Sequence, residues 1–129
     1  PGDNYDFSFS GLKTSVINYV RKNPDTSIEN ICASFQEAVV DVLATKARRA
    51  AREFNVKGLA IGGGVAANSA LRERILDVCI EDGLRAFIPS RAMCTDNAAM
   101  IASAAYWRYN QDGPTPLSAP AISGMKLVG

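Results

Sequence analysis

A run of three glycines between two apolar segments is the stretch whose chemistry is most sharply defined. Leu59–Ile61 ends a predicted buried strand, Gly62–Gly64 follows directly, and Asn68 precedes a segment with helical spacing of apolar residues. Glycine permits positive φ angles and close approach of the backbone to a ligand. Because Asn68 is a favourable N-cap, free N–H groups and the positive end of a helix dipole would surround an anion held in the turn. The pattern is neither a P-loop nor a full GxGxxG fingerprint. It predicts a phosphate or nucleotide cradle or, equally, a tight strand-to-helix turn that binds nothing.

Asp96 is the second candidate, because its carboxylate stands at the start of a predicted helix, in the segment Cys94–Asn97. Hard cations take oxygen ligands, so this carboxylate could ligate a metal that in turn holds a phosphate. The alternative is helix capping, in which Thr95 or Asp96 accepts hydrogen bonds from the free N–H groups of the first turn. The local pattern leaves both roles open.

Cys94 also precedes that helix, a position that lowers a thiol pKa and suits a nucleophile. The chain contains no histidine, so a Cys–His pair cannot be assembled, and a buried structural thiol is the favoured interpretation.

Basic residues gather near the end of a long predicted helix, where they either contact nucleic-acid phosphates or form a solvated helix face. The solvated face is the favoured interpretation, and Lys13 on the first helix is assigned no catalytic task. The basic residues are Lys46, Arg48, Arg49, Arg52 and Lys57.

The length and the amino-acid composition limit the classes of protein to which this chain could belong. With 129 residues, 47% hydrophobic and 21% charged, the chain has the composition of one soluble globular domain. Its net charge of +1 argues neither for nor against a nucleic-acid partner. Three cysteines without a CxxC pair predict a reducing, cytoplasmic compartment, and no apolar run reaches the length of a membrane span. Because the chain begins with Pro1 rather than Met, we expect residues 1–129 to be a single partial domain of a larger protein.

The hydrophobic periodicity predicts a helix-rich α/β fold. Phe7–Ser10 is either a short strand or the entry to the first helix. Thr26 and Glu29 form a capping-box pattern at the start of the long helix, and Gly83 is placed to end the third helix in the αL conformation. The predicted elements are helices 11–22, 28–55, 68–82 and 98–107, strands 56–61 and 84–88, and an extended proline-containing tail, 112–129.

The succession of strand, helix and strand predicts a βαβ unit with parallel strands. Ligands of such sheets bind at the carboxyl ends of the strands, here beside Gly62–Gly64 and residues 89–96. Two strands alone expose both edges of a sheet, so we expect further strands to lie outside this chain.

Three segments occur in the order and spacing of one family: Asp6–Thr14, Gly62–Asn68 followed by Leu71 and Arg72, and Cys94–Ala102. Over nearly its whole length the chain closely resembles the C-terminal lobe of the TsaD/Gcp family. These are tRNA threonylcarbamoyltransferases, formerly described as O-sialoglycoprotein endopeptidases. The resemblance implies a lobe of the ASKHA fold, which actin, heat-shock ATPases and sugar kinases share.

The resemblance also implies a reaction and a site. In this family the whole enzyme transfers threonylcarbamoyl from threonylcarbamoyl-adenylate to N6 of the tRNA adenosine 3′ of the anticodon. Carried over by motif, Asn68 would contact the adenylate, Gly62–Gly64 would line its pocket, and Asp96 would be a metal ligand. One divalent metal per subunit, iron or zinc, would bridge phosphate or carbamoyl oxygens of the substrate.

The chain departs from the family pattern because the other metal ligands, two histidines of the N-terminal lobe, are absent. We therefore expect the chain alone to bind metal and nucleotide weakly or not at all and to lack transferase activity. The implied partners are the N-terminal lobe, threonylcarbamoyl-adenylate, tRNA and other tRNA-modification subunits, with no membrane.

Two other function classes remain open. A non-catalytic truncated paralogue would bind other tRNA-modification subunits through its strand edges. An ATPase or sugar kinase of the same fold would turn over nucleotide without tRNA, although the segment Cys94–Asn97 argues against it. Neither a Ser/Cys–His arrangement nor HExxH supports a peptidase.

Overall fold

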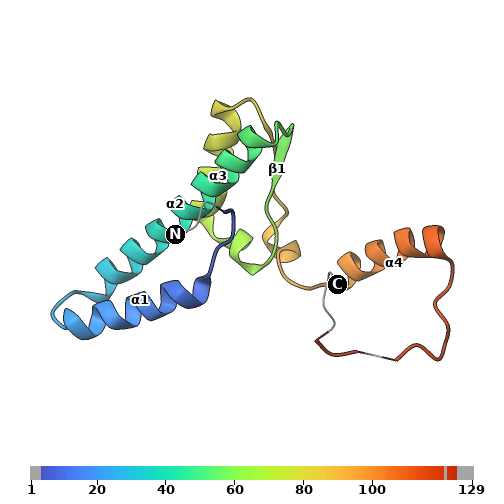
Figure 1. Cartoon of the computed structure of the whole chain (residues 1–129), viewed down its shortest axis with the longest axis horizontal. Helices are drawn as coiled ribbons and strands as arrows, with labels where there is room; N and C mark the ends of the chain where they lie inside the picture. The colour runs from blue at the N-terminus through green and yellow to red at the C-terminus, as the bar shows by residue number, and fades with distance from the viewer. Residues whose placement is uncertain (1–3, 121, 125–129) are drawn as a thin grey trace. The chain divides into compact units, whose positions relative to one another are not determined.

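The computed structural model describes residues 4–120 and 122–124 (Figure 1). The chain divides into two compact units, Pro1–Thr95 and Asp96–Gly129, and each is described by itself. The second unit contains the helix α4 (Ala98–Asp112). The first unit contains α1 (Phe9–Lys22), α2 (Ile28–Glu53), β1 (Gly58–Ala60), the 3-10 helix η1 (Gly64–Ala67), α3 (Ser69–Glu81), β2 (Arg85–Phe87) and the 3-10 helix η2 (Arg91–Met93).

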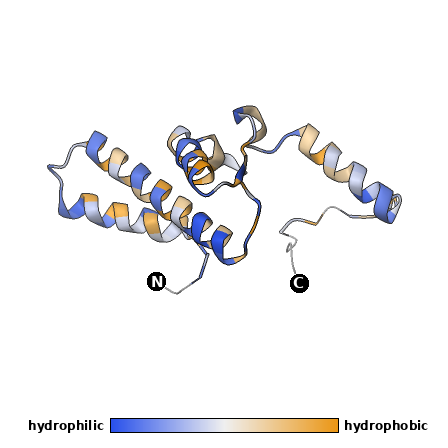
Figure 2. Ribbon diagram, turned by 90° about the horizontal axis from the view of Figure 1, so that it is seen from above, coloured by the Kyte–Doolittle hydropathy of each residue, from blue (hydrophilic) through white to orange (hydrophobic). Residues whose placement is uncertain are grey.

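The first two helices form a helical hairpin in which α1 runs back beside the N-terminal part of α2 (Figure 1). Hydrophobic residues recur along both helices (Figure 2). Ser8 caps α1, because its Oγ accepts a hydrogen bond from Gly11 N at 3.4 Å. Helix entry is therefore the correct alternative for the segment before Gly11, and α1 begins at Phe9, two residues earlier than predicted.

The long helix α2 is confirmed, but its predicted cap is wrong by one residue. Ser27, not Thr26, is the N-cap, and its Oγ accepts from Asn30 N at 3.3 Å. Glu29 still lies in the first turn, where a carboxylate is favourable beside the helix N-terminus. Serine and threonine are similar as caps, so the sequence does not separate two adjacent hydroxyl residues.

The predicted βαβ unit is present. Strands β1 and β2 are parallel, with Leu59 opposite Ala86 at the centre of the ladder, and α3 connects them. Both strands are shorter than predicted, and within the described residues each pairs only with the other. Gly83 follows α3 with φ of +65°, as expected of an αL residue that ends a helix.

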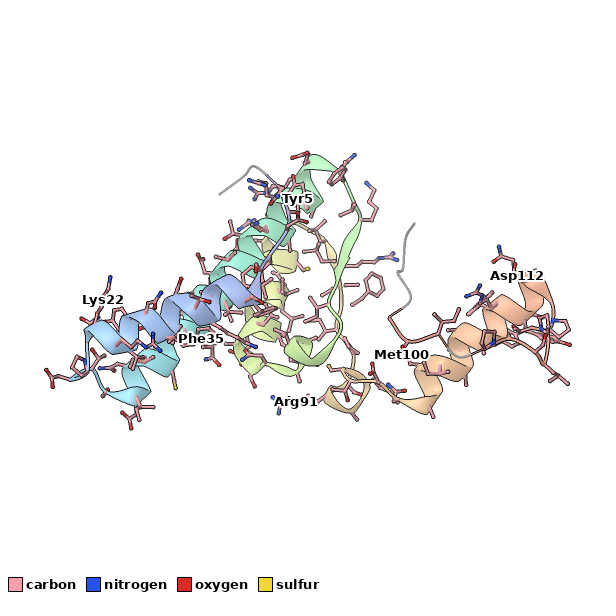
Figure 3. The ribbon with its side chains drawn as sticks, turned by 60° about the horizontal axis from the view of Figure 1, so that its bottom comes forward. Tyr5, Lys22, Phe35, Arg91, Met100 and Asp112 are labelled. Atoms are coloured by element: carbon pink, nitrogen blue, oxygen red, sulfur yellow. The ribbon has the colours of Figure 1, made fainter. Side chains whose placement is uncertain are left out.

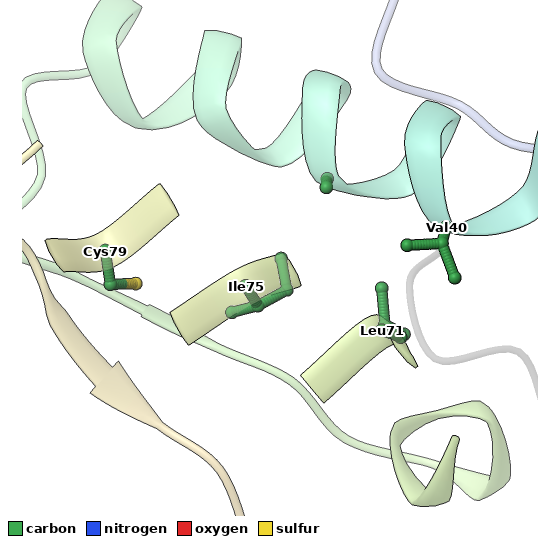
Figure 4. Packing of buried hydrophobic residues seen from close by; sticks show 5 residues of the cluster. Val40, Leu71, Ile75 and Cys79 are labelled. Carbon is green, nitrogen blue, oxygen red and sulfur yellow. The ribbon is translucent and has the colours of Figure 1, made fainter. Parts of the chain in front are cut away.

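The core of the first unit lies between α2, α3 and the strands. Val40 and Ala44 of α2 pack against Leu71, Ile75 and Cys79 of α3 (Figure 4). The partly buried residues around them come from α2, α3, the two strands and the residues next to the strands: Leu43, Ala47, Leu59, Ile61, Ala70, Leu84, Ala86 and Ile88. The described chain is therefore a helix-rich α/β protein with two parallel strands, and its core supports the segment that follows β1.

In the second unit, α4 continues to Asp112 rather than stopping near Trp107, and it ends at Gly113, which has φ of +77°. The described residues after α4, 113–120 and 122–124, contain neither helix nor strand. The rest of the predicted tail, residues 121 and 125–129, lies outside the described residues. Within the described chain, no helix combines the length and apolar character needed to cross a membrane.

Candidate functional site

The glycine turn, Gly62–Gly64, leaves the carboxyl end of β1 and leads into η1. Ile61 N still donates to Phe87 O at 3.2 Å, so the ladder holds the residue just before the turn. Gly63 has φ of +74°, a conformation that residues with a Cβ rarely adopt. A Cβ placed on any of the three glycines would meet no atom of the residues that the structure describes within 4 Å. Backbone conformation therefore explains Gly63, whereas internal packing does not explain Gly62 or Gly64.

The N–H groups of the turn are available to a ligand. In the described part of the chain, the backbone N–H groups of Gly62, Gly63 and Gly64 donate to no other group. The N–H groups further on are used inside η1, where Ala66 N donates to Gly63 O and Asn68 N to Val65 O, both at 3.0 Å. The turn thus offers free donors at the end of a strand and before a helix, the arrangement that suits an anion.

A cavity of about 330 Å³ borders the turn. Its lining is apolar apart from backbone groups, so it suits an apolar or aromatic part of a ligand better than a charged one. The lining residues are Phe9, Leu43, Ala47, Ile61, Gly62, Gly63, Gly64, Val65, Ala66, Leu71 and Ile75.

Asn68 is the N-cap of α3, as the sequence predicts. Its Oδ1 accepts from Leu71 N at 3.0 Å, and its Nδ2 donates to Gln36 Oε1 on α2 at 3.0 Å. Both ends of the amide are therefore engaged, and because Nδ2 carries two N–H donors, a ligand can take the second one without displacing Gln36. Sequence reasoning missed Gln36, because a polar residue 32 positions earlier gives no local sign of this contact. A nucleotide contact of Asn68 stays a prediction.

Asp96 is exposed and does not cap α4. The N-cap is Asn97, whose Oδ1 accepts from Met100 N at 2.9 Å, so the expectation that Thr95 or Asp96 caps this helix is wrong. Asp96 belongs to the second unit and Gly62–Gly64 to the first, so their facing one site stays a prediction. Within the described residues, no three His, Cys, Asp or Glu side chains group to hold a metal. Asp96 thus offers one oxygen donor, which by itself does not make a metal site.

Cys94 is a buried structural thiol, as favoured from the sequence. Its residue is 1% exposed, and its Sγ donates to Ser90 O at 3.4 Å. A nucleophile needs access to substrate, which this burial denies.

Arg49, Arg52 and Lys57 of the basic cluster are exposed, as expected of a solvated face, and several members of the cluster also make contacts within the protein. Arg48 and Arg52 both bind the carboxylate of Asp82 at the end of α3, with Arg52 Nη2 at 2.8 Å from Asp82 Oδ1. Arg49 lies over the Tyr5 ring, 4.7 Å from its centroid, near the C-terminal end of α2 (Figure 3). A contact of the cluster with nucleic-acid phosphates stays a prediction.

Asp82 makes stability depend on pH. Its hydrogen bonds from Arg48 and Arg52 hold its pKa far below the usual value, so the folded state favours the carboxylate. A lowered folded pKa contributes stability above the unfolded pKa of about 3.9, and this contribution disappears as pH falls through the folded pKa. We expect Asp82→Asn to lower the urea midpoint at pH 7 and the difference from the unsubstituted chain to shrink below pH 4. Urea unfolding followed by circular dichroism at pH 7, 5 and 3 measures it.

Asp77→Asn is the matched control for that titration, because Asp77 is exposed on the same helix and forms no ion pair within the described residues. It should leave the midpoint nearly unchanged at every pH. Equal effects of the two substitutions at pH 7 would contradict the role given to Asp82.

The amino-acid sequence is similar to those of known tRNA-modifying proteins. Residues 1–103 match TsaD, described as tRNA N6-adenosine threonylcarbamoyltransferase. The chain is 44% identical over 125 residues to the tRNA N6-adenosine threonylcarbamoyltransferase of Kosmotoga olearia and 48% identical over 132 residues to that of Desulfotalea psychrophila. Each alignment covers 97% of this chain and 38% of the relative. The protein of the same description from Geotalea daltonii is 51% identical over 104 residues, which cover 78% of this chain and 30% of that protein.

Proposed function

Because this chain belongs to the TsaD family of tRNA N6-adenosine threonylcarbamoyltransferases, we propose that it forms the C-terminal lobe of such an enzyme, with the ASKHA fold. The chain spans about 38% of the length of the first relatives, so the activity belongs to a whole protein of which this chain is one part. That protein transfers threonylcarbamoyl from threonylcarbamoyl-adenylate to N6 of the tRNA adenosine 3′ of the anticodon, in the cytoplasm.

The observation that carries the proposal is the glycine turn. Its free N–H groups are donors suited to the phosphate of an adenylate, and the bordering apolar cavity suits a flat ring. Gly62 and Gly64 lack a packing reason to be glycine, which is expected where the substrate rather than the protein occupies the space. Asn68 follows η1 and would donate its second Nδ2 hydrogen to the nucleotide while the first stays bonded to Gln36.

Asp96 would supply one ligand of the metal, and residues outside this chain would supply the others. Its carboxylate is exposed and does not cap α4, so its oxygen atoms can coordinate a metal ion. A single carboxylate does not hold iron or zinc tightly without further ligands. When bound, such a metal supplies electrophilic stabilisation of substrate oxygens. The chain's own part is to bind and orient the adenylate, and alone it would have no transferase activity.

A chimera tests the proposed function directly. This chain would replace the matching 38% of the Kosmotoga olearia protein, and the product would be supplied with threonylcarbamoyl-adenylate and unmodified tRNA. We expect threonylcarbamoyladenosine in the tRNA, detected by mass spectrometry of digested nucleosides. The parent protein is the positive control, and the parent without that segment is the negative control. A chimera that unfolds at the parent's temperature yet leaves tRNA unmodified would refute the proposal.

Gly62→Ala in that chimera separates ligand binding from folding. The added methyl group meets no protein atom, so the thermal unfolding temperature should stay within about 2 °C of the unsubstituted chimera. The same methyl group would meet the bound adenylate, so the KM for threonylcarbamoyl-adenylate should rise about tenfold or more. Steady-state rates over a range of adenylate concentrations provide the measurement.

Gly63→Ala is the contrasting variant, because φ of +74° with ψ of 174° is a conformation that essentially only glycine adopts, so alanine adds a folding penalty of about 1–3 kcal/mol to any loss of binding. A Gly62→Ala chimera with unchanged KM would remove the glycine turn from the substrate site.

The two-stranded sheet supports an alternative function, in which the chain is a non-catalytic module that binds another protein. Within the described residues, β1 and β2 pair only with each other, so each has an unpaired outer edge able to take a partner's strand. An inactive but correctly folded chimera that still captures another tRNA-modification subunit would favour this alternative.

A further inference from the structure

Arg72, in the first turn of α3, contacts two segments that are far apart in the sequence. Its Nη1 donates to Ala66 O in η1 at 2.9 Å. The same nitrogen lies 3.9 Å from Cys94 Sγ, in the segment after β2. Ala66 and Cys94 are each 1% exposed, so the guanidinium reaches into the interior of the first unit from a partly buried position.

The segment Ser90–Cys94 is held compactly at this contact. Cys94 Sγ donates to Ser90 O at 3.4 Å, and Met93 N donates to the same oxygen at 2.9 Å. A second arginine strengthens the junction, since Arg91 Nη2 donates to Ser69 Oγ at the start of α3 at 2.7 Å (Figure 3). Arg72 and Arg91 therefore join the segment after β2 to the N-terminal end of α3.

From these contacts we infer that Arg72 is a positioning residue, which fixes the glycine turn and the segment Ser90–Cys94 in one arrangement. The inference rests on the proposed function, which assigns the turn and Asp96, two residues after Cys94, to the same substrate. Arg72 itself touches neither Gly62–Gly64 nor Asp96 in any described contact, so it acts through Ala66 and Cys94.

The physical reason is the cost of a buried, unpaired acceptor. Without the guanidinium, Ala66 O loses its side-chain donor in a place that excludes water, and η1 must shift to recover a partner. A planar, permanently charged guanidinium can serve the carbonyl and the sulfur at once, which few other side chains can do. A small shift of η1 moves the attached turn, and substrate orientation is sensitive to displacements of about 1 Å.

The test compares Arg72→Met with Arg74→Met in the chimera. Arg74 lies on the same helix and binds Glu37 at 2.8 Å and Asp41 at 3.6 Å, and no polar contact of the described residues joins it to the turn or to the segment after β2. Arg72→Met should raise the KM for threonylcarbamoyl-adenylate about tenfold or more with a smaller change in kcat, whereas Arg74→Met should leave both unchanged. Arg72→Lys keeps one charged donor and should recover part of the loss.

Hydrogen exchange supplies a readout that does not depend on activity. Four protected amides report on the two segments: Ala66 and Asn68 in the first, Met93 and Cys94 in the second. In Arg72→Met, both pairs should exchange about tenfold faster, while Arg74→Met should change neither.

The outcomes separate this inference from the proposed function. An unsubstituted chimera that leaves tRNA unmodified defeats the proposed function, and exchange then decides by itself whether Arg72 joins the two segments. Unchanged exchange at Met93 and Cys94 in Arg72→Met would overturn the inference, as would equal KM changes in the two methionine variants.

Discussion

Ile75→Ala is expected to lower the free energy of unfolding of this chain by about 3–4 kcal/mol. Ile75 is 1% exposed and lies at the centre of the core between Val40, Leu71 and Cys79. Truncation removes buried methyl groups and leaves a cavity that rigid neighbours from α2 and α3 fill only in part. Because small domains are stable by only about 5–15 kcal/mol, this one change would remove much of the total. Urea unfolding followed by far-UV circular dichroism measures the loss.

Leu76→Ala is the matched control for the core substitution. Leu76 is the next residue of α3 and is 43% exposed, so its truncation loses less buried area and should cost about 1 kcal/mol or less. Equal losses for Ile75 and Leu76 would mean that α3 does not present the face described here to α2.

Gly58→Ala is the second substitution with a large expected effect, because β1 and β2 approach each other too closely there for a side chain. A Cβ on Gly58 would lie 2.6 Å from Arg85 O and 3.0 Å from the Phe87 ring. The first of these atoms is backbone and cannot rotate away, so the strands must separate. We expect a loss of about 1–3 kcal/mol in the free energy of unfolding, measured by the same urea titration.

Gly62→Ala is again the informative comparison, since it lies just beyond the same strand and its Cβ meets nothing within 4 Å. It should change the free energy of unfolding by less than about 0.5 kcal/mol. If Gly58→Ala proved equally harmless, the register that places Gly58 opposite Arg85 would be wrong.

Most secondary structure follows from local signals. Asn68 as the cap of α3 and Gly83 as its αL terminator were predictable because each acts on backbone groups a few residues away. The parallel pairing of β1 and β2 was predictable because a connecting helix requires a crossover. Element ends were less accurate: Ser27 and Asn97 are the true caps, since neighbouring polar residues compete for the same N–H groups and packing selects between them.

The contacts between distant residues could not be read from the sequence. The ion pairs of Arg48 and Arg52 with Asp82 and the bond between Asn68 and Gln36 join residues 30 to 34 positions apart. The spacing of the arginines on α2 is compatible both with a solvated helix face and with ion pairs to another element. Only the packing of α2 against α3 brings the Asp82 carboxylate within reach of Arg48 and Arg52.

By itself, the sequence determined the order of helices and strands, the position of the glycine turn and the family, because periodicity, caps and motifs are local properties of the chain. Only the tertiary structure decided that Arg72 links Ala66 to Cys94 and that, among the described residues, none accepts from the N–H groups of the turn or fills the space beside Gly62 and Gly64. The physical reason is that a donor is free, or a space open, only relative to what the rest of the fold packs against it.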